Sequence, residues 1–475
     1  MMTARRVLVV DLDGTLVHTD MLFETFWAAF AKNWATPFLA VRSFARGRAA
    51  LKRKLCELGA VDIASLPYNE GVIGYVRRWR AEGGRAALVT ASDRTLAEEV
   101  ASHLGIFDEV HGSDGETNLK GTQKAEFLEE RFGHEGFVYI GDAAADIPVW
   151  EKAEKAVTVN LPRAVKARVD ALGRDAEHLV SRVPSIKPYV KALRVHQWLK
   201  NLLVFVPMMT AHQFNLAALG HSLLAFIAFS FVASSVYVLN DLLDLSSDRA
   251  HPRNRNRPFA SGTIPIGSGV WLAPLLLLDG LAIASLLGES FLLVLAAYYA
   301  ATLSYSLYFK RRIVIDICLL AGLYTMRIIA GATATGITLS VWLLAFSIFF
   351  FFALAAVKRQ AELVNSLPKG EGQALGRGYR AEDLPLICNT ALAAGFVSVL
   401  VMALYVNSPA VLELYGYPQA LWGVCLVLLY WISRIVMVTH RGQMHDDPVV
   451  FAVRDSTSLL CLLIILAFAA GGMVL

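Results

Sequence analysis

The chain has 475 residues, of which 56% are hydrophobic and 18% are charged, and its formal net charge is +4 at pH 7. Soluble globular proteins carry about 45–50% apolar and about 25% charged residues. The composition therefore excludes a disordered chain, a collagen-like fibre and an ordinary soluble enzyme, and the small net charge gives no sign of nucleic-acid binding. Charged residues concentrate before residue 185 and long apolar runs follow, so we expect two domains, over residues 1–185 and 186–475.

Polar side chains follow three short apolar runs of the first domain. Asp11 and Asp13 follow the first run and Thr90 follows the second. Asp142 follows the third. Apolar runs that alternate with helical patterns predict a parallel sheet, in which the carboxyl ends of the strands share one edge. At that edge one carboxylate of the Asp11–Asp13 pair could attack phosphorus while the other moves a proton.

These motifs, in this order, resemble the haloacid dehalogenase (HAD) superfamily of phosphatases over about residues 5–180. The resemblance implies a Rossmann-like α/β fold with a helical cap at about residues 18–80. It implies four roles: nucleophile for Asp11, general acid and base for Asp13, phosphate-oxygen ligand for Thr90 and phosphoryl-binding cation for Lys124. It also implies one Mg²⁺, with ligands drawn from Asp11, Asp13, Asp142 and Asp146. Lys120 is the alternative lysine, and a non-catalytic domain is the alternative to a phosphatase.

The predicted cap is rich in aromatic and in basic side chains. Its aromatic residues include Phe23, Phe26, Trp27, Phe30, Trp34, Phe38 and Phe44, and its basic residues include Lys32, Arg42, Arg46, Arg48, Lys52, Arg53 and Lys54. Helices of this composition suit an anionic membrane surface. The aromatic residues would equally serve to pack the core of the cap, and the sequence leaves both interpretations open.

The second domain consists of long apolar runs. A membrane-spanning helix needs roughly 20 predominantly apolar residues, and about nine runs meet that rule. They are 198–214, 216–243, 268–288, 290–309, 313–331, 338–357, 384–406, 419–439 and 457–475. The first run is the weakest, because Lys200, Asn201 and Pro207 interrupt it.

Lys and Arg residues occupy every second connection between these runs, and the alternate connections carry none. Positive residues stay on the cytoplasmic side of a membrane. The apolar run before Asp11 is also too short for a signal peptide. We therefore predict a multi-pass protein of a bacterial plasma membrane, with the first domain and the charged connections in the cytoplasm and the C-terminus outside.

Polar residues gather at the cytoplasmic end of the second apolar run. At about 100° per residue, Asn240, Asp241, Asp244 and Asp248 fall on one sector of a helix. Neighbouring carboxylates need a cation, and an all-oxygen cluster suits Mg²⁺ that bridges to a diphosphate. Three arginines follow, namely Arg253, Arg255 and Arg257. They could clamp phosphates or serve only as positive-inside signals.

Further polar residues recur near the same membrane face, and we take them as candidate substrate ligands. Together with Asp248 and the three arginines, they are Lys200, Tyr305, Lys310, Tyr324, Arg327, Lys358, Arg359 and Arg441. Arg327 lies deep enough in its apolar run that a structural pairing is an equal alternative.

The segment NDLLDLSSDRAHPRNRNRP, with QWLKN before it and YSLYFKRRIVIDI after it, resembles the UbiA superfamily of intramembrane prenyltransferases. The DRAHP, KRQAEL and HRGQMHDDP segments are most similar to the decaprenyl-phosphate phosphoribosyltransferase branch of that superfamily. The resemblance runs from about residue 190 to the C-terminus and implies an all-α polytopic membrane domain. Two departures stand out: Asp316 alone remains of the second acidic motif, and Asn254 replaces a lysine.

The two resemblances imply consecutive activities in one enzyme. The membrane domain would transfer 5-phosphoribosyl from phosphoribosyl diphosphate to polyprenyl phosphate, with Asn240, Asp241 and Asp244 as catalytic residues and a Mg²⁺ held by Asp241, Asp244 and Asp248. The first domain would then remove the 5-phosphate, giving polyprenylphosphoryl ribose for cell-wall arabinan. Two alternatives stay open: prenyl transfer to an aromatic acceptor beside an unrelated phosphatase, and a regulatory soluble domain. The sequence leaves a homo-oligomer possible and undetermined.

Overall fold

The computed structural model describes residues 6–114, 119–180, 185–252, 254–366, 378–444 and 447–474. The chain forms two compact units. Unit 1 comprises the chain up to Leu193 together with Tyr237–Ala273, and unit 2 comprises Arg194–Val236 and Pro274–Leu475. Two helices, α11 (Leu216–Leu243) and α13 (Ile266–Ser285), therefore contribute residues to both units.

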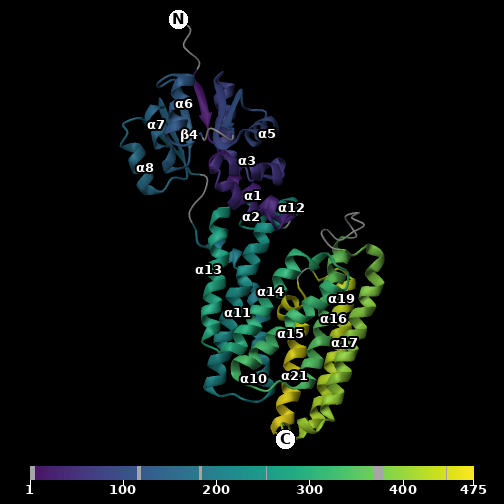
Figure 1. Ribbon diagram of the computed structural model, residues 1–475. Coiled ribbons are helices and arrows are strands. Elements are labelled where there is room, and N and C mark those ends of the chain that lie inside the picture. Colours follow the sequence, from purple (N-terminus) through teal and green to yellow (C-terminus); the bar gives the residue numbers. More distant parts are fainter. Residues whose placement is uncertain are drawn as a thin grey trace. The chain divides into compact units, whose positions relative to one another are not determined.

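Unit 1 is built around a six-stranded parallel sheet with the strand order β3-β2-β1-β4-β5-β6 (Figure 1). The strands are β1 (Val7–Val10), β2 (Arg85–Asp93), β3 (Glu109–Ser113), β4 (Phe137–Gly141), β5 (Lys155–Val159) and β6 (Asp175–Leu179). Every neighbouring pair is parallel. The arrangement confirms the predicted α/β fold.

The central strand β1 explains where a ligand site forms. All four of its residues are buried, with Leu8 and Val10 in one core and Val7 and Val9 in the other. A strand covered on both faces needs such a continuous apolar run. The strand order changes direction between β1 and β4, and parallel sheets open a ligand crevice at the carboxyl ends on either side of such a point.

Helices cover both faces of the sheet. α4 (Glu70–Ala81) and α5 (Arg94–Leu104) pack on one face, and α6 (Thr122–Phe132), α7 (Ile147–Lys152) and α8 (Arg163–Asp170) pack on the other. Between β1 and α4 lies a helical insertion at the place of the predicted cap, made of α1 (Met21–Lys32), α2 (Thr36–Phe44), α3 (Arg48–Leu58) and the 3₁₀ turn η1 (Ile63–Ser65). The short elements η2 (Ala144–Asp146), α9 (Lys187–Ala192), α12 (Leu245–Ala250) and η4 (Asn254–Asn256) complete unit 1.

The turn after β1 depends on one glycine. Gly14 has a φ of +72°, and a Cβ atom there would lie 2.0 Å from Oδ2 of Asp142. Residues with a side chain rarely adopt that backbone conformation. The glycine therefore allows the segment after β1 to lie against the carboxylate that follows β4.

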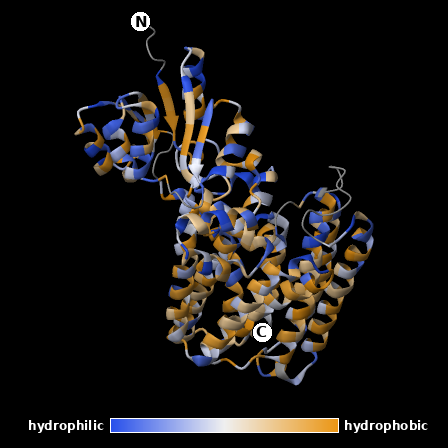
Figure 2. Ribbon diagram, turned by 45° about the horizontal axis from the view of Figure 1, so that its top comes forward, coloured by the Kyte–Doolittle hydropathy of each residue, from blue (hydrophilic) through white to orange (hydrophobic). Residues whose placement is uncertain are grey.

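Unit 2 is helical and apolar (Figure 2). Eight helices in the described parts of the chain are long and apolar enough to cross a membrane, which confirms an all-α polytopic domain. Besides α11 and α13 they comprise α14 (Glu289–Leu307), α15 (Ile315–Thr335), α16 (Val341–Ser366), α17 (Leu384–Val406), α19 (Leu421–His440) and α21 (Ser456–Val474). The shorter elements are η3 (Val195–Phe205), α10 (Val206–Thr210), η5 (Phe309–Arg311), η7 (Ala381–Asp383), α18 (Pro409–Leu412), η8 (Pro418–Ala420) and α20 (Pro448–Arg454).

The first of the nine predicted spans, 198–214, is not one long helix. It folds as the 3₁₀ helix η3 followed by the short helix α10, with Pro207 in the first turn of α10. The segment therefore lacks the regular long helix that the sequence predicts, and it is not among the eight spanning helices of the described residues.

Replacing Gly14 with alanine should lower the thermal unfolding midpoint, because the new Cβ atom collides with the Asp142 carboxylate. Gly105 offers a matched control: its φ is +62° and a Cβ atom there meets nothing within 4 Å. Gly105→Ala should cost only the left-handed backbone energy, about 1–2 kcal/mol, and Gly14→Ala should cost more. Thermal unfolding of both full-length variants tests this, and equal midpoints would contradict the close approach.

Candidate active sites

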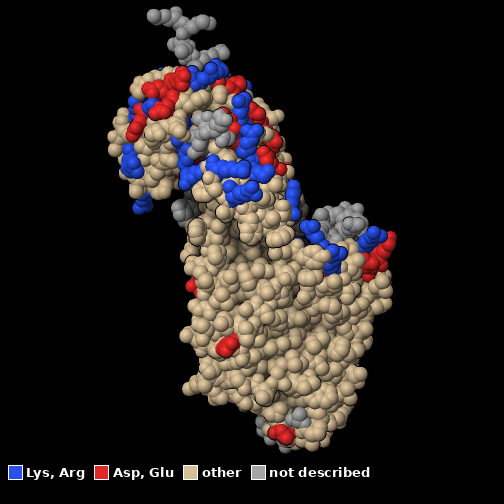
Figure 3. All heavy atoms as spheres, in the orientation of Figure 1, with Lys and Arg blue, Asp and Glu red and all other residues tan. Residues whose placement is uncertain are grey.

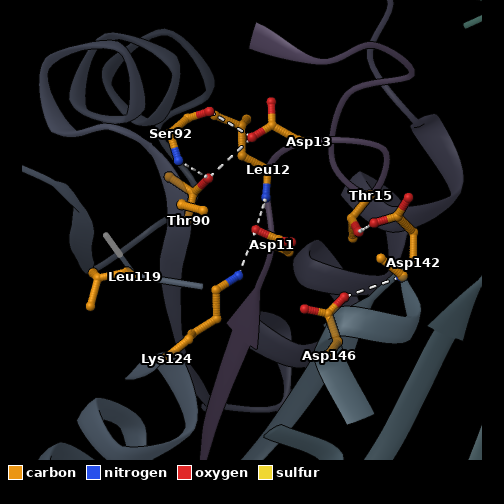
Figure 4. A network of polar contacts seen from close by, with 12 residues as sticks. Asp11, Leu12, Asp13, Thr15, Thr90, Ser92, Leu119, Lys124, Asp142 and Asp146 are labelled. Carbon is orange, nitrogen blue, oxygen red and sulfur yellow. Dashed lines mark hydrogen bonds and ion pairs between the residues drawn. The ribbon is translucent and has the colours of Figure 1, made fainter. Parts of the chain in front are cut away.

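The carboxyl edge of the sheet gathers the polar residues predicted to lie there (Figure 4). Asp11 follows β1, and its Oδ1 accepts a hydrogen bond from the Leu12 amide at 2.9 Å. The same oxygen lies 2.9 Å from Nζ of Lys124, a side chain of α6 that is 2% exposed. Burial would lower the pKa of Lys124, but the carboxylates of Asp11 and Asp146 outweigh burial and raise it. Asp11 therefore faces a permanently charged ammonium group.

Asp13 lies beside this pair and is held by two short hydrogen bonds. The Ser92 hydroxyl donates to its Oδ2 at 2.6 Å, and the Met21 amide donates to its Oδ1 at 2.7 Å. Burial, together with the charges of Asp20 and Asp11, raises the pKa of Asp13 to about 7. A carboxyl group with a pKa near neutrality can both give and accept a proton.

Three carboxylates meet between β1 and β4. Asp11, Asp142 and Asp146 each offer an oxygen within 4.8 Å of the others, and the described residues contain no second group of three that meets this distance. Burial and the charge of Asp11 raise the pKa of Asp142 to about 8 and that of Asp146 to about 6. A divalent cation would remove this repulsion, and carboxylate oxygens are the ligands that Mg²⁺ prefers. The three residues therefore fit a Mg²⁺ site.

The predicted hydroxyl and lysine also lie at this edge. Oγ1 of Thr90 is 3.5 Å from Oδ2 of Asp13. Lys120, the alternative lysine, is exposed, whereas Lys124 is buried against Asp11. The geometry thus favours Lys124 as the cation of the site.

Two residues outside the predicted set complete the site. Ser92 holds Asp13, and it could have been found because it lies two positions after Thr90, on the same face of a strand. Tyr139 donates to Oδ1 of Asp146 at 3.0 Å and accepts from Nζ of Lys124 at the same distance. It lies inside an apolar run, where the sequence gives no signal of this role.

The acidic motif at the end of α11 and in α12 forms a second site in unit 1, where Asp241 and Asp248 are buried. Nη1 of Arg257 lies 2.6 Å from Oδ2 of Asp248 and 3.3 Å from Oδ1 of Asp241. Asn254 donates to the other oxygen of Asp248 at 3.0 Å. Burial raises the pKa of Asp248 to about 6 although Arg257 opposes that shift. The Arg257 guanidinium group therefore lies between the carboxylates of Asp241 and Asp248.

The motif does not lie on one continuous helix as the sequence predicts. α11 ends at Leu243, α12 begins at Leu245, and Asp244 between them has a φ of −101°. Aspartate favours this position at the start of a helix. Within the described residues, the acidic side chains of this motif do not meet the 4.8 Å distance that the other trio meets. Arg255 is exposed, Asn240 and Asp244 are half-buried, and Arg253 lies outside the described residues.

An ion pair within unit 1 joins this motif to the cap. Arg249 of α12 donates two hydrogen bonds to the carboxylate of Glu24 on α1, at 3.0 Å and 2.5 Å. The two side chains are 5% and 3% exposed. The Nε of Arg249 also donates to the Ala260 carbonyl at 2.9 Å. No pattern in the sequence predicts this pair.

Unit 2 holds a cluster of buried charges around Asp447. Its Oδ2 lies 2.7 Å from Nζ of Lys200 and 3.1 Å from Nζ of Lys358, and its Oδ1 accepts a hydrogen bond from Tyr324 at 3.0 Å. Burial would raise the pKa of Asp447, but the two lysines outweigh burial and hold it below its usual range. The structure thus brings together three predicted ligands, Lys200, Tyr324 and Lys358, around a carboxylate outside the predicted set.

Arg359 and Asp316 form a closed pair inside unit 2. Nε of Arg359 lies 2.6 Å from Oδ2 of Asp316, and the side chains are 1% and 0% exposed. Arg359 also pairs with Glu362 and donates to Tyr305 at 2.9 Å. Asp316 further accepts a hydrogen bond from Tyr379 at 2.5 Å. This geometry favours a structural role for Arg359 over the predicted substrate contact.

Arg327 is likewise satisfied by the protein itself. Its Nε donates to Asn201 at 2.8 Å, its Nη2 donates to Tyr298 at 2.8 Å, and its Nη1 donates to the Leu323 carbonyl at 2.6 Å. The structural alternative is thus favoured for Arg327. Two other predicted ligands differ in exposure, since Lys310 is half-buried in η5 and Arg441 is exposed after α19.

Removing the Asp447 carboxylate should destabilise unit 2, because the buried Lys200 and the half-buried Lys358 lose their common partner. Asp447→Ala should lose roughly 3–5 kcal/mol of unfolding free energy, the range expected when a buried ion pair is broken. Glu413→Ala removes one carboxylate from an exposed position and serves as the control. Thermal unfolding in detergent compares the two variants, and an unchanged midpoint for Asp447→Ala would contradict the cluster.

Comparison with known proteins agrees with both units. Residues 201–453 match the UbiA prenyltransferase family, and residues 8–151 match the haloacid dehalogenase-like hydrolases. The Sinorhizobium fredii protein y4nM is 38% identical over 95% of this chain and 88% of its own length. Nodulation protein NoeC of Azorhizobium caulinodans is 38% identical over 58% of this chain and 90% of its own length.

A third relative is the decaprenyl-phosphate phosphoribosyltransferase of Mycobacterium tuberculosis, which is 36% identical over 59% of this chain and 93% of its own length. The helical membrane domain and the parallel sheet with its carboxylate trio agree with the two family matches. The chain therefore belongs to the UbiA prenyltransferase family and carries a haloacid dehalogenase-like domain ahead of its membrane domain.

Proposed function

We propose that this chain transfers 5-phosphoribosyl from phosphoribosyl diphosphate to a polyprenyl phosphate and then removes the 5-phosphate with its HAD-like domain. The observation that carries the proposal is the buried group of Asp241, Asp248 and Arg257, where metal-binding oxygens and a cation share one place. The substrate class is proposed from the relative named decaprenyl-phosphate phosphoribosyltransferase. The product, polyprenylphosphoryl ribose, would serve cell-wall arabinan synthesis.

The state of Asp316 supports one diphosphate-binding site instead of two. Its carboxylate is taken by Arg359 and Tyr379, so it is not free to hold a second metal. A prenyltransferase with an aromatic acceptor would have to bind a prenyl diphosphate, for which the family uses both acidic motifs. A lipid that brings a single phosphate as the nucleophile fits the one remaining motif better.

In the proposed transfer, a phosphate oxygen of the lipid forms a bond to C1 of the ribose, the bond from C1 to the diphosphate oxygen breaks, and diphosphate leaves. Asp241, Asp244 and Asp248 would be the ligands of a Mg²⁺ that neutralises the diphosphate, but within the described residues they do not converge and Arg257 bridges two of them, so metal binding would require this arginine to release them. Asn240 would orient these carboxylates, and Arg257 would bind diphosphate oxygens.

The cluster in unit 2 suits a phosphate group as well. Asp447 pairs with two lysines, Lys200 and Lys358. Lys358 is half-buried, and its ammonium group can also donate to a phosphate oxygen. We propose that a substrate phosphate binds beside Lys358.

In the proposed dephosphorylation, Asp11 attacks phosphorus, the bond to the ribose O5 breaks, and protonated Asp13 gives its proton to that oxygen. Lys124 and Thr90 would hold the phosphoryl oxygens. Water then cleaves the aspartyl phosphate with Asp13 as base, which releases phosphate and restores the enzyme. Mg²⁺ held by Asp11, Asp142 and Asp146, with the Asp13 carbonyl, would neutralise the phosphoryl charge. Both sites would face the cytoplasm of a bacterium, with the C-terminus outside.

The decisive experiment incubates the purified chain with Mg²⁺, polyprenyl phosphate and labelled phosphoribosyl diphosphate, and determines the mass of the lipid product. We expect a lipid-linked ribose without its 5-phosphate. A product that keeps the phosphate would refute the role of the HAD-like domain, and the absence of any lipid product would refute the transferase. A parallel reaction with an aromatic acid and polyprenyl diphosphate tests the alternative.

The two sites should fail separately. Asp11→Asn should lower dephosphorylation at least about a thousandfold, because it removes the nucleophile, and leave the transfer intact. Asp241→Asn should lower the transfer and leave the dephosphorylation intact. Glu126→Gln, on the exposed face of α6, the helix that carries Lys124, controls for the loss of one carboxylate in the HAD-like domain. Diphosphate release from phosphoribosyl diphosphate measures the transfer, and phosphate release from separately prepared polyprenylphosphoryl 5-phosphoribose measures the dephosphorylation. With each step supplied with its own substrate, a joint loss in either variant would contradict the two-site scheme.

A further inference from the structure

Four large apolar side chains of the cap are exposed on and just before α2. They are Trp34, Phe38, Val41 and Phe44, with exposed fractions of 75%, 72%, 72% and 54%. Their spacing of four, three and three residues places them on one side of the helix. Scattered apolar residues are normal on a protein surface, but a contiguous group marks a contact with another apolar phase.

These side chains are not needed to pack the cap. The aromatic core of the cap is formed on α1, where Trp27 is 6% exposed and packs against Phe26 and Phe30 with ring centroids 5.4 Å and 5.7 Å apart. The interpretation that aromatic residues pack the cap core therefore applies to α1, and the interpretation that they form a surface applies to the α2 region. On α1 Trp27 is buried and Phe26 and Phe30 are half-buried against it, whereas the large apolar residues of the α2 region are exposed.

A basic cavity of about 700 Å³ adjoins α2 and α3. Four cationic side chains line it, namely Arg42, Arg46, Arg53 and Lys54, against the two acidic residues Glu57 and Asp114. Lys54 pairs with Glu57 at 2.9 Å. Among the described residues, Arg42 and Arg46 are in no ion pair, so the cavity keeps an excess of positive charge. Figure 3 shows that charged side chains of both signs gather on the HAD-like part of the chain, in contrast with the apolar helices.

The helix α3 connects this cavity with the phosphatase site. Arg53 and Lys54 line the cavity, whereas Nζ of the preceding Lys52 donates to the Ala91 carbonyl at 2.5 Å, on the strand that carries Thr90. Burial lowers the pKa of Lys52, and the carboxylate of Asp13 opposes that shift. Helix α3 therefore directs Lys52 toward the strand that carries Thr90, and it directs Arg53 and Lys54 toward the cavity.

We propose that the α2 surface, defined as Trp34, Phe38, Val41 and Phe44, docks on an anionic lipid bilayer, with lipid phosphates in the basic cavity. Aromatic side chains enter the boundary between headgroups and acyl chains, and neighbouring arginines bind the negative surface. The membrane domain keeps the chain in a bilayer, so this partner is always present at high effective concentration. The inference does not depend on which group the membrane domain transfers.

The test uses the full chain in nanodiscs of phosphatidylcholine and phosphatidylglycerol that carry a nitroxide-labelled lipid. The five cysteines form no disulfide among the described residues, and they are replaced by serine so that Phe38→Cys carries a single fluorophore. Lys166→Cys on the exposed side of α8 is the matched control. We expect quenching at position 38 and none at position 166. Equal quenching at both positions, or none at position 38, would overturn the proposal.

The contribution of charge is tested in the same preparation. Arg42→Glu with Arg46→Glu should reduce quenching at position 38 at least about threefold, as should nanodiscs of phosphatidylcholine alone, because basic residues bind anionic lipid. Arg163→Glu with Arg168→Glu changes the net charge equally on α8 and should have no effect. Unchanged quenching in the Arg42 and Arg46 variant would overturn the role of the cavity.

Two other occupants of the α2 surface predict different results. A second copy of the chain would make the fluorescence change depend on the number of chains per nanodisc, and an acidic peptide would leave the label beyond reach of the nitroxide. Either result would overturn the lipid assignment. The readout needs no enzymatic turnover, so a failure here is distinguishable from a failure of the proposed reactions. The unfolding midpoint of each variant shows whether the fold is retained.

Discussion

A carboxylate removed from water needs a positive partner, and this requirement organises the interior of both units. Asp11 meets Lys124, Asp248 meets Arg257, and Asp447 meets two lysines. For Asp11 and Asp447 the two charges come from distant parts of the chain, whereas Asp248 and Arg257 are nine positions apart. The helices and strands that carry them are therefore fixed relative to one another within their unit by a charge contact as well as by apolar packing.

The same requirement gives these places groups that a phosphate or a metal ion could bind. A cation that balances a carboxylate can also bind a phosphate oxygen, and carboxylates that repel one another can share a divalent metal. Asp142 and Asp146 illustrate the second case, since their raised pKa values reflect burial beside Asp11. Arg359 and Arg327 illustrate the opposite case, in which groups of the protein itself pair with the guanidinium.

The sheet and its carboxylates could be predicted because each apolar strand is followed directly by its functional residues. The long apolar helices could be predicted for a similar reason, since length and composition suffice. Tertiary pairing could not: Lys200 and Asp447 are 247 positions apart, and nothing local indicates that they meet. The end of α11 at Leu243 could not be predicted either, because the spacing of Asp241, Asp244 and Asp248 fits an uninterrupted helix equally well.

The pair of Glu24 and Arg249 makes the segment after α11 chemically dependent on the cap. Without residues 1–193, the Arg249 guanidinium would keep the Ala260 carbonyl but lose its carboxylate. An unpaired guanidinium in a buried place is costly, so the shortened chain would have to hydrate this arginine or bind another anion. Dividing this chain into two polypeptides is therefore not a neutral change for this sequence. The part that contains the membrane domain would be destabilised, because Arg249 would lose its carboxylate partner.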